Sequence, residues 1–82
     1  MSVPRQEDID ALWPVKEDIS VIHLSDRADD FYALGYGVTR IEKTAKAGEH
    51  SFIPYVRLWL ENGTIVEFCQ HRLHAVCFKP TA

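Results

Sequence analysis

FIPYVRLWLENGTIVEFCQ, residues 52–70, is the stretch that decides the fold. Two runs rich in β-branched and aromatic residues, Phe52–Leu60 and Ile65–Gln70, lie on either side of Asn62-Gly63. Runs of this composition favour strands. Asn-Gly between them favours a two-residue type I′ turn, because both central residues tolerate a positive φ. The stretch therefore predicts a β-hairpin that turns at Asn62-Gly63.

A two-residue turn sets the register of this hairpin, with Leu60 facing Ile65 and Val56 facing Cys69. Both faces of the hairpin are then substantially apolar, whereas a hairpin with one solvated face alternates more cleanly between apolar and polar residues. We therefore expect something to cover each face, helices on one side and a partner or a second subunit on the other. Homodimerisation through one face is one way to remove the surplus apolar area from water.

The whole chain, residues 1–82, has the length of one small domain. Pro4–Leu12 is expected to be a helix, because Pro4 suits a first helical position and Pro14 ends the helix. The remaining predicted strands are Ile19–Leu24, Val38–Thr44 and Leu73–Phe78. We predict an α+β fold, in which the N-terminal helix packs on an antiparallel sheet of four or five strands with a β-meander in the C-terminal half.

The segment SDRADDFYALG, residues 25–35, allows two interpretations. Ser25 or Asp26 could cap a helix that runs to Leu34, with Gly35 as its left-handed terminator. The alternative is an irregular acidic loop. The pattern of residue types leaves both open.

Residues 69–77, CQHRLHAVC, bring two cysteines and two histidines close together in sequence. If the chain turns tightly at His71-Arg72, then Cys69, His71 and His74 crowd one face, and these are residue types that bind zinc. The spacing does not match a standard zinc knuckle, and a free cysteine commonly packs as a small apolar residue. We expect a hairpin corner and no cofactor, with a small zinc-binding protein as an alternative function.

Charge is distributed unevenly along the chain, whose formal net charge is −3. Residues 1–35 contain eight acids and three bases, and residues 36–82 contain four acids and six bases. Asp26, Asp29 and Asp30 form a candidate acidic patch, either a solvated surface or a carboxylate surface that engages a basic partner. Such a partner could be a complex built to hold nucleic acid, since nucleic-acid sites are themselves rows of Lys and Arg.

Direct binding of single-stranded nucleic acid is a second alternative function. Tyr55 and Trp59 share a predicted strand face with Arg57, and aromatic rings beside cations can stack on bases. The sequence pI of about 5.7 is low for a dedicated nucleic-acid binder. No GxSxG, HExxH or P-loop motif occurs in the sequence. We therefore expect a protein that is not an enzyme.

Part of the sequence resembles a known class of small protein. The elements are Ile41-Glu42-Lys43-Thr44, Ala47-Gly48-Glu49, Pro54-Tyr55 and Glu61-Asn62-Gly63. Over residues 40–66 they are similar to a pattern found in small phage- and prophage-encoded β-sheet proteins, some of them anti-CRISPR inhibitors. The resemblance implies a small sheet protein that binds and blocks a larger host complex. It carries no functional residue over to this chain.

These observations favour a non-enzymatic protein-interaction module of the cytoplasm. The start MSVPRQEDID lacks the apolar stretch of a signal peptide, and no apolar run approaches the roughly 20 residues of a membrane-spanning helix. Two cysteines, with no expected export signal and no other cross-link, favour reduced thiols over a disulfide. We expect the partner to be a protein and its contacts to be Asp26, Asp29, Asp30, Tyr55 and Trp59.

Overall fold

The computed structural model describes residues 3–80, which form one short helix, one 3-10 turn and six strands. Helix α1 is Gln6–Leu12 and the 3-10 turn η1 is Gln70–Arg72. The strands form two antiparallel sheets, in the orders β2-β1-β6 and β3-β4-β5. Their bounds are β1 Ile19–His23, β2 Phe31–Ala33, β3 Val38–Ala47, β4 Phe52–Leu60, β5 Ile65–Cys69 and β6 Ala75–Phe78.

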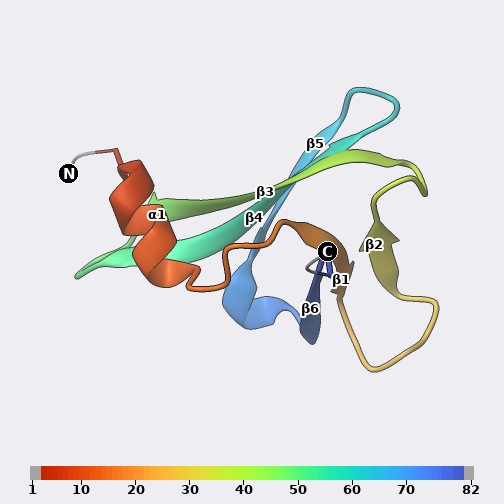
Figure 1. The fold of residues 1–82 in the computed structure, drawn as a ribbon, viewed down its shortest axis with the longest axis horizontal. Helices are drawn as coiled ribbons and strands as arrows, with labels where there is room; N and C mark the ends of the chain where they lie inside the picture. The colour runs from red at the N-terminus through yellow and green to blue at the C-terminus, as the bar shows by residue number, and fades with distance from the viewer. Residues whose placement is uncertain (1–2, 81–82) are drawn as a thin grey trace.

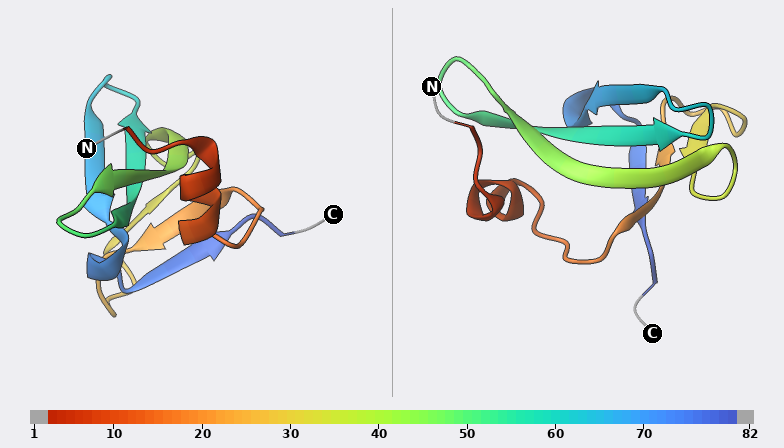
Figure 2. Two further views of the ribbon diagram at one scale, coloured as in Figure 1. Left: turned by 90° about the vertical axis from the view of Figure 1, so that its left-hand side faces the viewer. Right: turned by 90° about the horizontal axis from the view of Figure 1, so that it is seen from above.

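The two sheets pack on each other, and the helix lies beside one of them. In Figure 1, β1 and β6 lie below the β3-β4-β5 sheet. Figure 2 shows α1 and the segment that follows it beside β3, which is an edge strand of its sheet. One side of the β3-β4-β5 sheet is therefore covered by the other sheet, and the opposite side faces outward.

The predicted α+β class is confirmed, but the single sheet of four or five strands is wrong. The predicted meander is present as β3-β4-β5, and the chain then leaves that sheet through η1. Strand β6 pairs with β1, placing Ile19 opposite Phe78 and Ile22 opposite Val76. The hairpin expected at His71-Arg72 is therefore also wrong. Because the chain crosses from β5 to the edge of β1, Val76 and Phe78 pack against the core. A hairpin that only added a strand to the edge of β5 would not need this packing.

The hairpin at Asn62-Gly63 is confirmed, but its turn and register differ from the prediction. The N–H of Gly63 donates to the carbonyl of Leu60 at 3.0 Å, and the N–H of Leu60 donates to the carbonyl of Thr64 at 2.9 Å. Gly63 has φ 88°, and no residue other than glycine has a positive φ in the described chain. The loop is thus a type I turn followed by a left-handed glycine that forms a bulge.

This bulge shifts β5 by one residue relative to the predicted register. Trp59 now faces Ile65, and Arg57 faces Glu67. The side chain of Asn62 accepts a hydrogen bond from the N–H of Thr64 at 2.9 Å, which satisfies the turn while Asn62 keeps a negative φ. Because side chains alternate along a strand, a shift of one residue moves every β5 side chain to the other face.

Of the two interpretations left open for residues 25–35, the helix is wrong, and the acidic loop is confirmed for residues 24–30. Ser25 donates a hydrogen bond to the carboxylate of Asp30 at 2.8 Å, and the N–H of Leu24 donates to the carbonyl of Asp30 at 3.0 Å. Short polar side chains that bond locally in this way compete with helix formation. The chain then enters β2, in which Ala33 pairs with Val21.

The core lies between the inner faces of the two sheets and includes the end of the helix. Ile22 of β1 and Val56 and Leu58 of β4 are completely buried. Trp13, directly after α1, is also buried, and its indole N–H donates to the carbonyl of Thr44 in β3 at 3.1 Å. A buried indole N–H needs such a partner, and this bond fixes the end of α1 to β3.

A lysine holds the next segment of the chain. Lys43 lies on the inner side of β3 opposite Val56. Its ammonium group donates to the carbonyls of Val15 at 2.8 Å and Glu17 at 3.2 Å, with a longer contact of 3.4 Å to Lys16. Three donors on one ammonium thereby satisfy three carbonyls of a segment without secondary structure. The α1–β1 connection is thus tied to β3.

We expect Lys43→Met to lower the free energy of unfolding by about 1–3 kcal/mol, the range for losing hydrogen bonds to a charged group. Urea denaturation followed by tryptophan fluorescence measures this change. Lys79→Met, at an exposed lysine after β6, is the control and should be close to neutral. Equal stability of the two variants would show that Lys43 does not hold the segment.

We expect Gly63→Ala to lower the free energy of unfolding by about 1–2 kcal/mol, because an alanine in left-handed backbone is strained. A Cβ at Gly63 would meet no atom within 4 Å, so the cost is conformational alone. Gly63→Asn should lose less, since asparagine tolerates this region. Unfolding by urea compares the three proteins, and a full loss in Gly63→Asn would contradict the assigned turn.

Candidate functional site

Strand register defines an outward-facing surface on the β3-β4-β5 sheet. Residues directly opposite each other on paired strands share a face, and two such rows are Arg40-Trp59-Ile65 and Glu42-Arg57-Glu67. We call this surface the outer face. It comprises Arg40, Glu42, Thr44, Lys46, Ile53, Tyr55, Arg57, Trp59, Ile65, Glu67 and Cys69.

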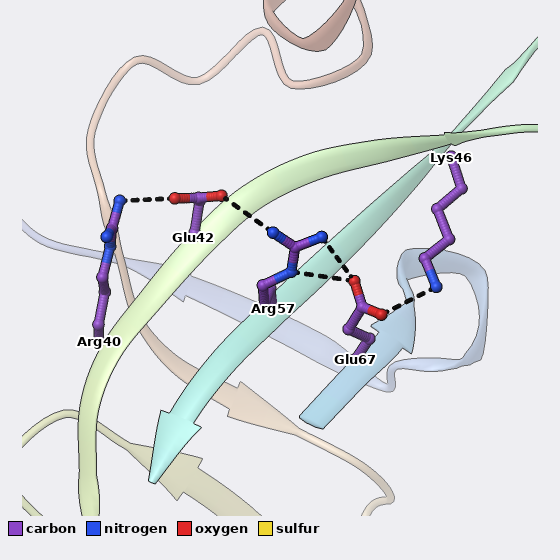
Figure 3. Close-up of polar contacts among 5 residues, drawn as sticks. All are labelled: Arg40, Glu42, Lys46, Arg57 and Glu67. Atoms are coloured by element: carbon purple, nitrogen blue, oxygen red, sulfur yellow. Dashed lines mark hydrogen bonds and ion pairs between the residues drawn. The ribbon is translucent and has the colours of Figure 1, made fainter. Parts of the chain in front are cut away.

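Five charged side chains form a continuous ladder across the outer face, drawn in Figure 3. The guanidinium of Arg57 contacts Glu67 at 2.9 Å and Glu42 at 3.9 Å. The two carboxylates are each shared with a further cation, Glu42 with Arg40 at 2.6 Å and Glu67 with Lys46 at 2.9 Å. Single surface ion pairs contribute little, but an alternating network restrains all its members together. The ladder has a cation at each end.

The same cations lie over the aromatic rings of the outer face. Arg40 lies 4.7 Å from the ring centroid of Trp59, and Lys46 lies 4.8 Å from that of Tyr55. Arg57, at 5.9 Å, also approaches Trp59. A cation within about 6 Å of a ring face is attracted by its quadrupole. The rings and the cations therefore hold each other in defined positions.

The network also sets the charge state of Glu67. The hydrogen bond from Lys46 is the main influence that lowers the pKa of Glu67 below its ordinary value of 4.5; burial, the next largest influence, opposes it, and Arg57 acts in the same direction as Lys46. Glu67 thus stays ionised, and keeps its ion pairs with Lys46 and Arg57, below the pH at which an ordinary glutamate is protonated.

Two exposed apolar side chains lie at the end of the sheet where β3 begins and the β4–β5 hairpin turns. Ile65 is 54% exposed and lies in the row of Trp59. Tyr36 is 80% exposed, between two glycines that both have positive φ. The N–H of Glu61 donates to the carbonyl of Gly37 at 3.0 Å, which ties the Tyr36 loop to the β4–β5 hairpin. Tyr36 and Ile65 were not among the expected contacts; a tyrosine flanked by two glycines was the available signal for the first.

The expected contact residues fall on two separate elements. Tyr55 and Trp59 share the outer face, whereas Asp26, Asp29 and Asp30 lie in the β1–β2 loop. Within that loop Asp29 pairs with Arg27 at 3.5 Å, and Asp30 accepts a hydrogen bond from Ser25. Two of the three carboxylates therefore already have partners in the loop, which leaves Asp26 as its most available charge.

The residues of the zinc alternative are not brought together. Cys69 lies opposite Tyr55 on the outer face, while His71 lies in η1 and is exposed. His74 is exposed beyond η1 and its N–H donates to the carbonyl of His23 at 2.8 Å. Across residues 3–80 no three side chains of Cys, His, Asp or Glu are grouped so as to hold a metal ion. Both cysteines are unpaired thiols.

Comparison with known proteins returns no relative: no protein-family model matches the chain, and neither a curated protein nor a solved structure gives a significant match. Within residues 3–80 the only α-helix, α1, is far too short to cross a membrane.

The ladder makes stability depend on pH in a definite direction. Because the pKa of Glu67 is lowered in the folded state, its contribution is fully present above about pH 4.5, the ordinary value for glutamate, and is lost as pH falls through the lower folded-state value. We expect Glu67→Gln to remove this part of the acid destabilisation.

Urea denaturation at a series of pH values between about 7 and 3 measures the effect through its linkage to proton binding. Glu49→Gln, at an exposed site in the β3–β4 loop, is the matched control. The control should keep the acid-dependent loss of stability. A Glu67→Gln profile parallel to that of the unmodified protein would contradict the role of the ladder.

Proposed function

We propose that this chain is a non-enzymatic protein-interaction module whose main contact surface is the outer face. The observation that carries the proposal is the exposed sheet face on which Trp59 and Tyr55 are held in place by Arg40 and Lys46. Tryptophan, tyrosine and arginine are the residue types most enriched at protein interfaces and among their energetic hot spots. Side chains that are already ordered lose less conformational entropy on binding.

A protein partner fits this face better than single-stranded nucleic acid. Stacking of bases needs free ring faces, and here Arg40 and Lys46 lie over the rings of Trp59 and Tyr55. Glu42 and Glu67 stand between the cations in the ladder and would repel a phosphate backbone. These two features favour the protein-binding interpretation over the alternative from the sequence.

The chemistry of the partner follows from the arrangement of the face. The apolar end, Trp59 with Ile65 and the neighbouring Tyr36, suits an apolar patch on the partner. The cations Arg40 and Lys46 end the ladder and are the most exposed members, at 63% and 45%, so they suit carboxylates around that patch. Blocking a larger host complex, the role implied by the phage-like resemblance, would require no catalytic group and stays a prediction.

The acidic loop is a proposed secondary contact of the same module. Asp26, Asp29 and Asp30 are on a different element from the outer face and would meet a basic region of the partner. Exposed charges of this kind act mainly on the association rate and on its dependence on salt. Their contribution is therefore separable from that of the aromatic face.

We expect Trp59→Ala and Ile65→Arg to weaken partner binding by about 2 kcal/mol or more each, the loss typical of interface hot spots. The partner is captured from an extract of the native cell, identified by mass spectrometry and titrated in purified form. Phe31→Ala, at an exposed aromatic of the other sheet, is the matched control and should bind normally.

The same titration tests the acidic loop and the oligomeric state. Neutralising Asp26, Asp29 and Asp30 together to asparagine should slow association and flatten its salt dependence. If Trp59→Ala and Ile65→Arg bind as tightly as Phe31→Ala, the outer face is not the contact. If the captured partner is a second copy, and Ile65→Arg makes the protein monomeric, the module acts as a homodimer through this face.

A further inference from the structure

A cleft of about 590 Å³ runs along the free edge of β3. One wall consists of five consecutive β3 residues, 39–43, and α1 and the segment leading into β1 face them across the cleft. Figure 2 shows this arrangement, with α1 and the following segment beside β3. Ile9, Ile19, Leu34 and Ile41 supply the apolar lining. The cleft shares Arg40 and Glu42 with the outer face, but the rings of Trp59 and Tyr55 are not part of its lining.

Strand geometry shows which backbone groups of β3 face this cleft. The N–H of Leu60 in β4 donates to Thr64, on the β5 side. Because N–H and C=O directions alternate along a strand, Trp59 and Arg57 direct their backbone groups to β3, where they face Arg40 and Glu42. The hydrogen bond from the N–H of Gly48 to the carbonyl of Ser51, just beyond the other end of the β3–β4 pairing, fits the same alternation of backbone directions.

The backbone groups of Ile41 and Lys43 therefore point away from β4 and into the cleft. Apart from an isolated bridge between Leu34 and Val38 at its start, β3 pairs only with β4 within the described chain, so Ile41 and Lys43 present two N–H and two C=O groups in the repeat of an unfinished sheet. Unpaired edges of this kind accept an added strand. An extended peptide is the ligand whose own groups repeat with the same spacing.

We propose that this cleft binds an extended, acidic segment of another protein, which adds as a strand to the edge of β3 at Ile41 and Lys43. The charge of the lining selects the chemistry of the segment. Lys16 and Lys79 line the cleft, and neither side chain has an ion pair or hydrogen bond in the described part of the chain. The charged lining residues are four cations, Lys16, Arg40, Lys43 and Lys79, and three carboxylates, Asp10, Asp18 and Glu42, so the net charge of the lining is +1.

A second copy of this chain does not fit as the occupant. The edge of β3 is recessed beside α1 and beside the segment that Lys43 anchors through the carbonyls of Val15 and Glu17. Two edges recessed in this way cannot approach to hydrogen-bonding distance, whereas a single narrow strand can enter. Side chains that alternate between apolar and acidic would meet the apolar lining and the two lysines in turn.

The test uses a capped octapeptide of alternating valine and glutamate as the probe, with a valine–lysine octapeptide as its control. Site-resolved hydrogen exchange by NMR follows single amides of the intact protein. In the free protein the amides of Ile41 and Lys43 should exchange quickly and that of Glu42 slowly, because only Glu42 is bonded to β4. Saturation with the acidic probe should slow Ile41 and Lys43 by about tenfold or more.

Charge variants provide the second arm. Lys16→Glu combined with Lys79→Glu should weaken the acidic probe by about tenfold or more, while Arg27→Glu with Arg72→Glu, an equal charge change outside the cleft, should not. Ile65→Arg, on β5 and outside the cleft lining, should bind the probe normally, so this site and the proposed outer-face contact succeed or fail separately. Unchanged exchange at Ile41 and Lys43 under saturating probe, or equal binding of the valine–lysine peptide, would overturn the proposal.

Discussion

Burial of two small sheet faces against each other is the constraint on which the rest of this structure depends. A three-stranded sheet with one apolar face is only marginally stable alone, and here Ile22 of one sheet and Val56 and Leu58 of the other become completely buried together. Trp13 joins this core from the end of α1. Within residues 3–80 no further layer covers the opposite side of the β3-β4-β5 sheet, so the outer face is left uncovered by the described chain.

The outer face carries aromatic residues although no other layer of the described chain covers it. Trp59 and Tyr55 are not left bare, because Arg40 and Lys46 lie over their rings. The carboxylates between the cations keep the face close to neutral. A surface of this type is compatible with water because charged groups shield its rings, which a purely apolar face would not allow.

The sequence pattern was sufficient where the controlling interactions are local. The strand composition of residues 52–70 and the Asn-Gly pair predicted the hairpin, and Pro4 and Pro14 placed the helix within two residues of α1. The register was missed because Asn-Gly is compatible with two turn types, and the hydrogen bond from Thr64 to the side chain of Asn62 selects the one with a bulge.

Other differences arose where distant segments decide the outcome. Strand β6 does not extend the meander, because it pairs with the edge of β1, a strand far away in sequence. No local sequence pattern predicts that pairing. The inward orientation of Lys43 also depends on a distant segment, because its partners are carbonyls of residues 15–17. Of the site, Tyr55 and Trp59 could be assigned to one face from strand periodicity, whereas the β3 cleft depends on tertiary packing and has no sequence signature.

The crossover at η1 affects the order in which the two sheets can form while the chain is being synthesised. The β3-β4-β5 meander is built from neighbouring segments and can close as soon as it emerges, since short loops are entropically cheap. Strand β1 is made earlier but completes its sheet only with β6, the last strand of the described residues; the contact of Ser20 with Cys77 spans 57 residues. Until β6 has been synthesised, β1 therefore has one unpaired edge, and the nascent chain is most open to mispairing or chaperone capture at that strand.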